Sequence, residues 1–127
     1  MEKTVELEWK SVIPPDFEGI PDKAGIYIIS TLQKTDDKYE VKYVGQTDNL
    51  YVRAKEHWSR HEKNERLKKH ISEKFVMKLC FSPVESRKDR EGLVLYLYHL
   101  FDPFFNNTSP PGETAIKCCL PMVRRHR

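Results

Sequence analysis

Five side chains of this 127-residue sequence are of the types used to move phosphoryl groups: Tyr27, Tyr43, Arg53, His57 and Glu91. Each tyrosine lies beside a glycine in a β-branched run, in Gly25-Ile26-Tyr27 and in Tyr43-Val44-Gly45. Arg53 and His57 are four residues apart, so on a helix their side chains can converge on one point. Two phenols, a guanidinium, an imidazole and a carboxylate could together hold a metal ion, neutralise a phosphate and move a proton.

Each of these residues also has a purely structural interpretation. Tyrosines in strands usually pack with the hydroxyl bonded to a partner, and a lone histidine is usually structural or exposed. Arg53 could pair with Glu56 at the surface. Glu91 could lie exposed in the first turn of a helix, where the helix dipole favours a carboxylate. If Glu91 instead lies near the apolar core, either a bound metal ion or Arg53 has to meet its charge.

Two strands must position the tyrosines, and the chain predicts both of them. The run Ala24–Thr31 is β-branched and aromatic, which is typical of a buried strand. A polar turn at Lys34–Lys38 follows, and alternation over Tyr39–Gly45 predicts the second strand of an antiparallel hairpin.

Three helices and a further strand follow the hairpin. Asp48 or Asn49 predicts the N-cap of the first helix, and Ser86 predicts that of the last. The last helix is apolar nearly all round, as in a helix buried on most faces, and Pro103 ends it. The predicted elements are helices over 50 to about 62, 65–73 and 86–101, and a strand over 75–81. The order β-β-α-α-β-α predicts an α+β fold, a small antiparallel sheet with helices packed on it.

Length and composition predict one modest domain. Apolar residues make up 39% of the chain and charged residues 32%, which is typical of a polar globular protein. No apolar run approaches the roughly eighteen residues of a membrane span, and the first residues lack the apolar core of a signal peptide. Three cysteines, without a Cys-x-x-Cys pattern or a histidine cluster, predict reduced thiols and no zinc site. We therefore expect a cytoplasmic protein with no membrane partner.

Basic residues are concentrated in 53–69 and 124–127 of a chain whose net charge is +3. Such clusters are as typical of a solvated helix face as of a phosphate-binding surface. On the second interpretation they would contact phosphates with little base preference. The candidate phosphate contacts are Lys55, Arg60, Lys68 and Lys69.

The central part of the chain resembles the GIY-YIG nucleases. Gly25-Ile26-Tyr27 matches the first signature tripeptide of that family, and Tyr43-Val44-Gly45 matches the second in its common valine form. Arg53 follows Tyr43 by ten residues, as the catalytic arginine of the family does, and His57 lies four further on, where the family has histidine or tyrosine.

The later part of the chain extends this resemblance to about residues 24–107. Glu91 and Asn106 are fifteen residues apart. They are similar to the metal-binding glutamate and the following asparagine of the homing-endonuclease branch. Asn107 is an alternative counterpart of that asparagine.

The resemblance implies a three-stranded antiparallel sheet flanked by helices, and divalent-metal-dependent hydrolysis of DNA phosphodiester bonds. Glu91 would hold one Mg²⁺ or Mn²⁺, and Arg53 would neutralise charge on the non-bridging oxygens. Tyr27 or Tyr43 would activate or orient the attacking water, and His57 would relay its proton or hold the phosphate.

Two further residues are candidate substrate contacts on this resemblance. Asn106 would orient the site by hydrogen bonding, and Gly45 belongs to the second signature tripeptide. We expect the two tyrosine hydroxyls, the guanidinium of Arg53 and the carboxylate of Glu91 to line one concave surface.

The predicted organisation is an irregular arm over 1–23 with a short strand near Val5–Trp9, a nuclease domain over 24–107 and a basic tail over 108–127. Two other functions remain open: a catalytically weak nucleic-acid-binding module, and a nuclease subunit that relies on a protein partner for targeting. The carboxylate of Glu91 favours an enzyme, since a pure binder does not need it. The sequence leaves open whether the DNA is duplex or branched, whether RNA is a substrate, and the oligomeric state.

Overall fold

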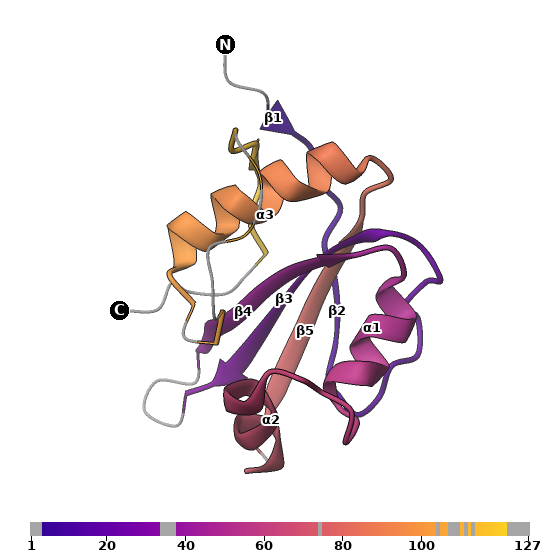
Figure 1. Cartoon of the computed structure of the whole chain (residues 1–127), viewed down its shortest axis with the longest axis vertical. Helices are drawn as coiled ribbons and strands as arrows, with labels where there is room; N and C mark the ends of the chain where they lie inside the picture. The colour runs from indigo at the N-terminus through magenta and orange to yellow at the C-terminus, as the bar shows by residue number, and fades with distance from the viewer. Residues whose placement is uncertain are drawn as a thin grey trace.

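A central sheet lies between α3 on one side and α1 and α2 on the other (Figure 1). The computed structural model describes residues 4–33, 38–73, 75–103, 105–106, 110, 112 and 114–121. Its elements in chain order are β1 (Thr4–Val5), β2 (Lys10–Val12), β3 (Gly25–Leu32), β4 (Tyr39–Thr47), α1 (Leu50–His57), α2 (Glu65–Ser72), β5 (Met77–Pro83), α3 (Arg87–Phe101) and β6 (Lys117–Cys118). The predicted α+β class is confirmed.

The central sheet is antiparallel, with strand order β2-β5-β3-β4. It has one strand more than expected, because β2 from the N-terminal arm pairs with β5, placing Ser11 opposite Cys80. A strand of three residues is too short to show the alternation by which strands are recognised in a sequence. At the other edge, β4 carries the second tyrosine.

Alternation along β3 divides the side chains between two cores. Ile26 and Ile28 pack with the apolar residues of α3, whereas Tyr27 and Ile29 pack with those of α1 and α2. Tyr43 of β4 packs against the second core as well. Both tyrosines therefore lie on the sheet face that α1 and α2 cover.

Helix α1 ends earlier than the sequence predicts. Asn49 caps its start by accepting a hydrogen bond from the backbone N–H of Val52, and Trp58 is its C-cap residue. The chain then turns back, since the backbone N–H of Glu62 donates to the carbonyl of Ser59 at 3.3 Å. This return loop brings residues 59–64 against the last turn of α1. Helices α2 and α3 lie close to their predicted positions.

The two ends of the described chain meet in a small parallel sheet. Thr4 of β1 lies opposite Lys117 of β6. The strand expected near Val5–Trp9 is wrong in its bounds, because β1 ends at Val5 and β2 begins at Lys10. Asn107 and the basic residues 124–127 lie outside the described residues.

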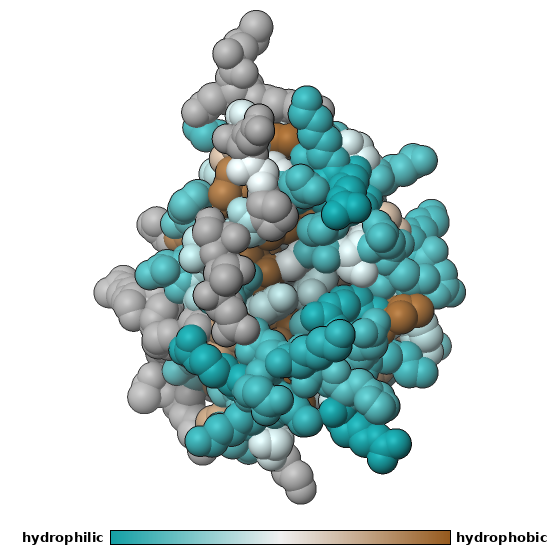
Figure 2. Space-filling model, viewed as in Figure 1, coloured by the Kyte–Doolittle hydropathy of each residue, from teal (hydrophilic) through white to brown (hydrophobic). Residues whose placement is uncertain are grey.

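Hydrophilic residues cover most of the face shown in Figure 2, with apolar ones scattered among them. Within the described part of the chain, no helix combines the length and apolar character needed to cross a membrane. Cys80 and Cys118 are buried and Cys119 is exposed, and all three are free thiols.

Candidate active site

Tyr27 and Gly45 face each other across the β3–β4 hairpin. A Cβ atom on Gly45 would lie 2.6 Å from the hydroxyl oxygen of Tyr27. Only glycine therefore leaves space for the phenol ring, which is 4% exposed. The ring of Tyr43 stacks beside it, with 6.1 Å between the ring centroids.

His57, the last residue of α1, is buried behind both tyrosines. Its Nε2 lies 2.7 Å from the hydroxyl oxygen of Tyr27. The imidazole centroid is 5.3 Å from the ring of Tyr27 and 5.3 Å from that of Tyr43. The side chain is 0% exposed, so His57 cannot contact a phosphate. The expectation that it holds the phosphate is therefore wrong, and the relay role remains a prediction.

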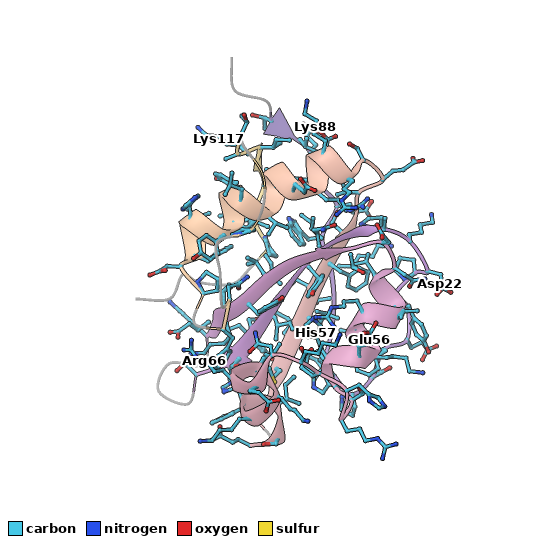
Figure 3. All side chains as sticks on the ribbon, in the orientation of Figure 1. Asp22, Glu56, His57, Arg66, Lys88 and Lys117 are labelled. Carbon is cyan, nitrogen blue, oxygen red and sulfur yellow. The ribbon has the colours of Figure 1, made fainter. Side chains whose placement is uncertain are left out.

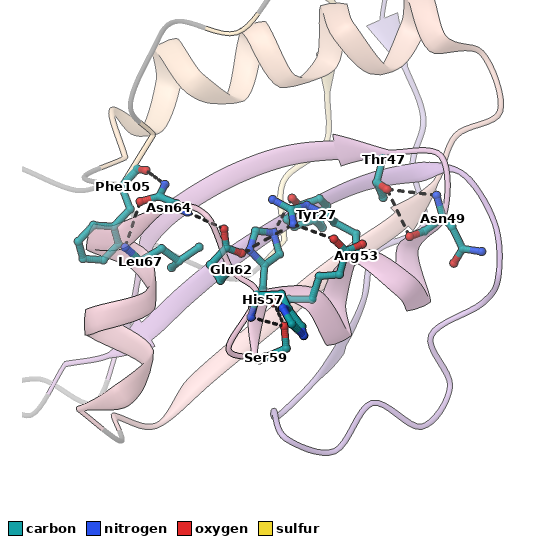
Figure 4. Close-up of polar contacts among 12 residues, drawn as sticks. Tyr27, Thr47, Asn49, Arg53, His57, Ser59, Glu62, Asn64, Leu67 and Phe105 are labelled. Carbon is teal, nitrogen blue, oxygen red and sulfur yellow. Dashed lines mark hydrogen bonds and ion pairs between the residues drawn. The ribbon is translucent and has the colours of Figure 1, made fainter.

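Glu62 contacts the other ring nitrogen of His57. The return loop after α1 places the carboxylate of Glu62 against His57 Nδ1 (Figure 4). The second carboxylate oxygen, Oε1, accepts a hydrogen bond from the backbone N–H of Asn64 at 2.9 Å. The Glu62 side chain is 1% exposed, so its charge is met by protein groups and not by bulk water.

Arg53 lies on α1 one turn before His57 and completes the polar cluster. Its Nη1 is 3.8 Å from a carboxylate oxygen of Glu62 and 3.7 Å from one of Glu56. Burial alone would lower the pKa of Arg53, but the neighbouring Tyr27, Glu62 and Tyr43, with a hydrogen bond to Tyr27, raise it. Arg53 is therefore a permanent cation.

The surroundings of the buried groups set their charges. Burial raises the pKa of Tyr27 well above its usual value. Burial also lowers the pKa of His57, although its contact with Glu62 opposes the change. Burial would raise the pKa of Glu62, but hydrogen bonds from His57 and a backbone N–H, with the charges of His57 and Arg53, lower it. At neutral pH, Tyr27 is protonated, His57 is neutral and Glu62 is ionised.

A cavity of about 390 Å³ opens beside β4 and exposes part of this cluster. Arg53, 30% exposed, and Lys63 provide two cations in its lining, which also includes the buried carboxylate of Glu62. Tyr43 lines the cavity, whereas Tyr27 lies beneath Gly45. Two cations and a phenol around a concave surface suit an anion of the size of a phosphate.

Asn106 lies at the same cavity and holds the edge strand β4. Its side-chain oxygen accepts a hydrogen bond from the backbone N–H of Val44 at 3.0 Å, and its Nδ2 donates to the Val44 carbonyl at 2.9 Å. One side chain thus pairs with both polar groups of Val44, as a further strand would.

The residues of this site lie in a stretch of the chain that matches a known protein family. A family model of the GIY-YIG catalytic domain matches residues 23–99, more than half of the chain. The chain belongs to the GIY-YIG family. The family is one of nucleases, so the cluster around Tyr27 and Arg53 lies in a nuclease-type domain. Comparisons with curated proteins and with solved structures find no match.

Glu91, the predicted metal ligand of the GIY-YIG site, lies apart from the other four residues. It is on α3, across the sheet from α1; the labelled Lys88 and His57 of these two helices lie on opposite sides of the strands (Figure 3). Glu91 lines a second cavity, of about 620 Å³. Its carboxylate is 27% exposed and lies 3.2 Å from Nε of Arg87. Glu91 and Tyr43 line different cavities, and their sharing of one concave surface remains a prediction.

The rotational position of α3 explains this separation. Arg90 faces the sheet, 3% exposed, where its guanidinium donates to Oε1 of Gln46 at 3.0 Å and to Oδ1 of Asp48 at 2.9 Å. The next residue of a helix is rotated by about 100°, so Glu91 does not share the direction of Arg90. Val94, three residues further on, lines the cavity at β4. The two cavities are thus about one helical turn apart along α3.

The donor chemistry around Glu91 fits a divalent metal ion only in part. In the described ranges, no group of three or more His, Cys, Asp or Glu side chains could hold an ion. Mg²⁺ is commonly held by one or two carboxylates, with waters and substrate phosphates completing its shell. Glu91 and Asp89 line one cavity and provide carboxylates of this kind. Their side of the sheet, however, is not that of Tyr43.

None of the four basic residues predicted to contact phosphates lines the cavity beside β4. The ammonium of Lys55 lies 5.3 Å from the centroid of the Tyr51 ring, and Nζ of Lys68 donates to the carbonyl of Arg60 at 3.0 Å. Lys69 is exposed on α2. Phosphate binding by these residues remains a prediction about the outer face of α1 and α2.

Two residues of the site, Glu62 and Lys63, were not expected from the sequence. A helix continuing to Glu62 would have separated it from His57, and only the early end of α1 lets the chain return. The available signals were Ser59 and Asn64, whose polar side chains are typical of a turn and of a helix N-cap. Asn64 does cap α2, accepting from the backbone N–H of Leu67 at 3.1 Å.

Proposed function

We propose that this GIY-YIG protein is a divalent-metal-dependent endonuclease that hydrolyses DNA phosphodiester bonds. The observation that carries the proposal is the cavity beside β4, which the side chains of Arg53 and Tyr43 both line. Membership in a nuclease family supports the reaction type. The polarity and positive charge of the cavity support a phosphate as the group bound there.

Arg53 binds the scissile phosphate in this proposal. Its guanidinium can donate two parallel hydrogen bonds to the non-bridging oxygens and offset the charge that grows on them in the transition state. Lys63, which also lines the cavity, supplies a second cation. Both residues act on the phosphate backbone, so they imply no preference for base sequence.

Tyr43 contacts the attacking water, because it is the signature phenol that lines the cavity. It orients the water toward phosphorus and can accept its proton where neighbouring cations stabilise a phenolate. Arg53 is the permanent cation beside it. Tyr27 is buried, and it holds Arg53 and His57 in place.

Glu91, with Asp89 beside it in the same cavity, would hold the Mg²⁺ or Mn²⁺. Such an ion supplies Lewis-acid polarisation of a phosphate oxygen and stabilises the leaving oxygen. The DNA substrate would have to extend across the edge strand β4 to reach both cavities. The free thiols support a reducing, cytoplasmic location.

The proposal is tested by cleavage of plasmid and of a panel of branched DNAs, with Mn²⁺ and with a chelator. Arg53→Ala should lower kcat by about 10²-fold or more, the loss typical of removing a preorganised charge contact. Lys10→Ala is the matched control, since it removes a cation at the opposite edge of the sheet. Cleavage that persists in chelator, or that Arg53→Ala leaves intact, would contradict the proposal.

One observation favours an alternative, a nucleic-acid-binding module with weak catalysis. Glu91 is ion-paired with Arg87 and lines a different cavity from Tyr43. In that case the protein would bind DNA with an affinity that falls steeply with salt, yet cleave none of the substrates alone. Cleavage that appears only after a protein partner is added would instead indicate a subunit that needs targeting.

A further inference from the structure

We propose that Glu62 is a positioning residue of the nuclease site, which fixes the direction of a buried chain of hydrogen bonds that ends at the guanidinium of Arg53. The chain runs Arg53, Tyr27, His57, Glu62, and Figure 4 shows these four side chains converging between α1 and the sheet. The catalytic consequence rests on the proposed function. The direction of the hydrogen bonds does not depend on the proposed function.

The two ends of the chain have opposite hydrogen-bonding properties. A guanidinium can only donate, and an ionised carboxylate can only accept. Because Glu62 can only accept, His57 has to carry its proton on Nδ1. The Nε2 of the neutral ring then has a lone pair and accepts from the hydroxyl of Tyr27, 2.7 Å away. The Tyr27 oxygen is left to accept from Arg53, with which it shares a hydrogen bond.

Burial makes this direction a requirement. The side chains of His57 and Glu62 are 0% and 1% exposed, and Tyr27 is 4% exposed. Water cannot replace a partner that faces the wrong way, so a reversed ring would leave unpaired polar groups in the interior. The two ends of the chain, Arg53 and Glu62, line the cavity, and of these two Arg53 is the more exposed, at 30% against 1%.

Within the part of the chain that the structure describes, the other groups around His57 do not supply another acceptor for Nδ1. Tyr43 approaches with its ring, edge-on to the imidazole. Glu56 acts on His57 only through its charge, and Arg53 adds a positive charge that opposes protonation. Burial keeps the pKa of His57 below its usual value, so the ring is neutral at the pH where a nuclease works. Protonated His57 would direct an N–H at the hydrogen of Tyr27 and break the chain.

Without the charge of Glu62, the tautomer of His57 is no longer fixed. A neutral amide at this position could donate to Nδ1, and the proton would then lie on Nε2, facing Tyr27. Tyr27 would have to turn its hydrogen away, toward Arg53. The guanidinium would lose its acceptor and move. A displacement of about 1 Å in a catalytic group can lower the rate by about 10²-fold.

Two glutamates allow a matched test. Glu62→Gln and Glu56→Gln each remove one carboxylate that lies close to Nη1 of Arg53, at 3.8 Å and 3.7 Å. Only Glu62 contacts His57. The ring nitrogens of His57 are observed by long-range ¹H–¹⁵N NMR of the full chain, with the resonance identified by its loss in His57→Gln. We expect the Nδ1–H tautomer in the parent and in Glu56→Gln, and substantial Nε2–H in Glu62→Gln.

Cleavage gives the second measurement. Glu62→Gln should lower kcat by about 10²-fold, whereas Glu56→Gln should change it less than about threefold. The acidic limb of the pH profile of kcat should move to lower pH in Glu62→Gln, because its charge raises the pKa of His57 in the parent. Glu62→Asp keeps an acceptor-only group, so it should retain the Nδ1–H tautomer even if it is less stable.

The outcomes separate this inference from the proposed function. An unchanged tautomer in Glu62→Gln, or equal rates in the two glutamine variants, would overturn the role of Glu62. A parent protein that cleaves no DNA would contradict the proposed function, while the tautomer of His57 would still show whether Glu62 sets the direction of the chain. If Glu62→Gln does not fold, Glu62→Asp and the parent decide the tautomer.

Discussion

Gly45 gives Tyr27 the space that its ring occupies, so the smallest possible enlargement should disturb the site. Gly45→Ala would place a methyl group 2.6 Å from the Tyr27 hydroxyl oxygen. We expect a loss of about 1–3 kcal/mol in the free energy of unfolding, as in other overpacked interiors, together with loss of the Tyr27–His57 hydrogen bond. Urea unfolding and the NMR signals of His57 measure the two effects.

The control for this prediction is to introduce Gly45→Ala into the Tyr27→Ala variant. Removing the phenol opens room for the new methyl group, so adding Gly45→Ala there should cost much less than in the parent. Equal costs in both backgrounds would show that the contact with Tyr27 is not the reason for glycine at this position.

Glu91 can be tested by separating binding from cleavage. Glu91→Gln removes the charge that a metal ion needs and keeps the shape of the side chain, so metal-dependent cleavage should be lost. DNA binding should persist or tighten, since one negative charge facing phosphate is gone. Its side chain is 27% exposed, so the stability should change by less than about 0.5 kcal/mol. The exposed Glu85→Gln is the control.

Equal cleavage by Glu91→Gln and the parent would show that Glu91 is not the metal ligand. The metal would then have to be held by other groups. Titration of Mn²⁺ against the two proteins, without DNA and with the uncleaved substrate, would show which state binds it.

At the scale of the elements, Arg90 fixes the start of α3 to the end of β4. Its guanidinium donates to the side chains of Gln46 and Asp48 and to the carbonyls of Val84 and Glu85. Arg90→Lys keeps the charge but cannot reach all four acceptors. We expect a loss of about 1–3 kcal/mol in unfolding free energy, measured by urea titration.

The neighbouring Arg87 offers the comparison for this prediction. Its side chain is 72% exposed, so Arg87→Lys should change the unfolding free energy by less than about 0.5 kcal/mol. If both variants lose a similar amount of unfolding free energy, the contacts of Arg90 are not the cause. The loss would then come from replacing any arginine in the first turn of α3.

The elements that carry strong local patterns could be predicted from the sequence. The β3–β4 hairpin has long β-branched strands, and α2 and α3 begin after Asn64 and Ser86, both good N-caps. These elements fix Tyr27, Tyr43 and Arg53 on one side of the sheet. The convergence of Arg53, His57 and the tyrosines followed from helical spacing and is present in the structure.

The parts that could not be predicted depend on tertiary contacts. β2 is held by pairing with β5 and has no local pattern of its own. Glu62 reaches His57 only because α1 ends early. The side of α3 that Glu91 faces depends on Arg90, a buried charge whose four acceptors come from two stretches of chain, 46–48 and 84–85. A helix that is apolar nearly all round in its sequence does not show which face meets the sheet.

At the scale of the whole molecule, stability should fall as the pH drops below about 6.5. Burial lowers the pKa of both His57 and His70. At pH values between the lowered pKa and the usual histidine pKa, the unfolded chain therefore binds more protons than the folded one. Glu62, whose pKa is also lowered, adds a further loss below about pH 4.3. Urea midpoints between about pH 4 and pH 7.5 measure this dependence.

Substituting each histidine in turn shows how much of the pH dependence of stability comes from that residue. His57→Gln and His70→Gln should each flatten part of the pH dependence of the urea midpoint between about pH 5 and pH 6.5. A parent midpoint that does not change with pH in this range would contradict neutral burial of the two rings.

The pairing of β1 with β6 closes a loop of more than a hundred residues with only two residue pairs, so it should open before the central sheet does. One of the two tryptophans lies beside the β1–β6 pairing, which should open early, and the other lies beside the candidate active site. Trp9 donates from Nε1 to the carbonyl of Cys119 at 2.9 Å beside the closure, and the ring of Trp58 lies 6.4 Å from that of His57. The protein therefore carries two intrinsic optical probes, and Trp9→Phe and Trp58→Phe would let fluorescence follow the fraying of the ends and the melting of the site as separate events.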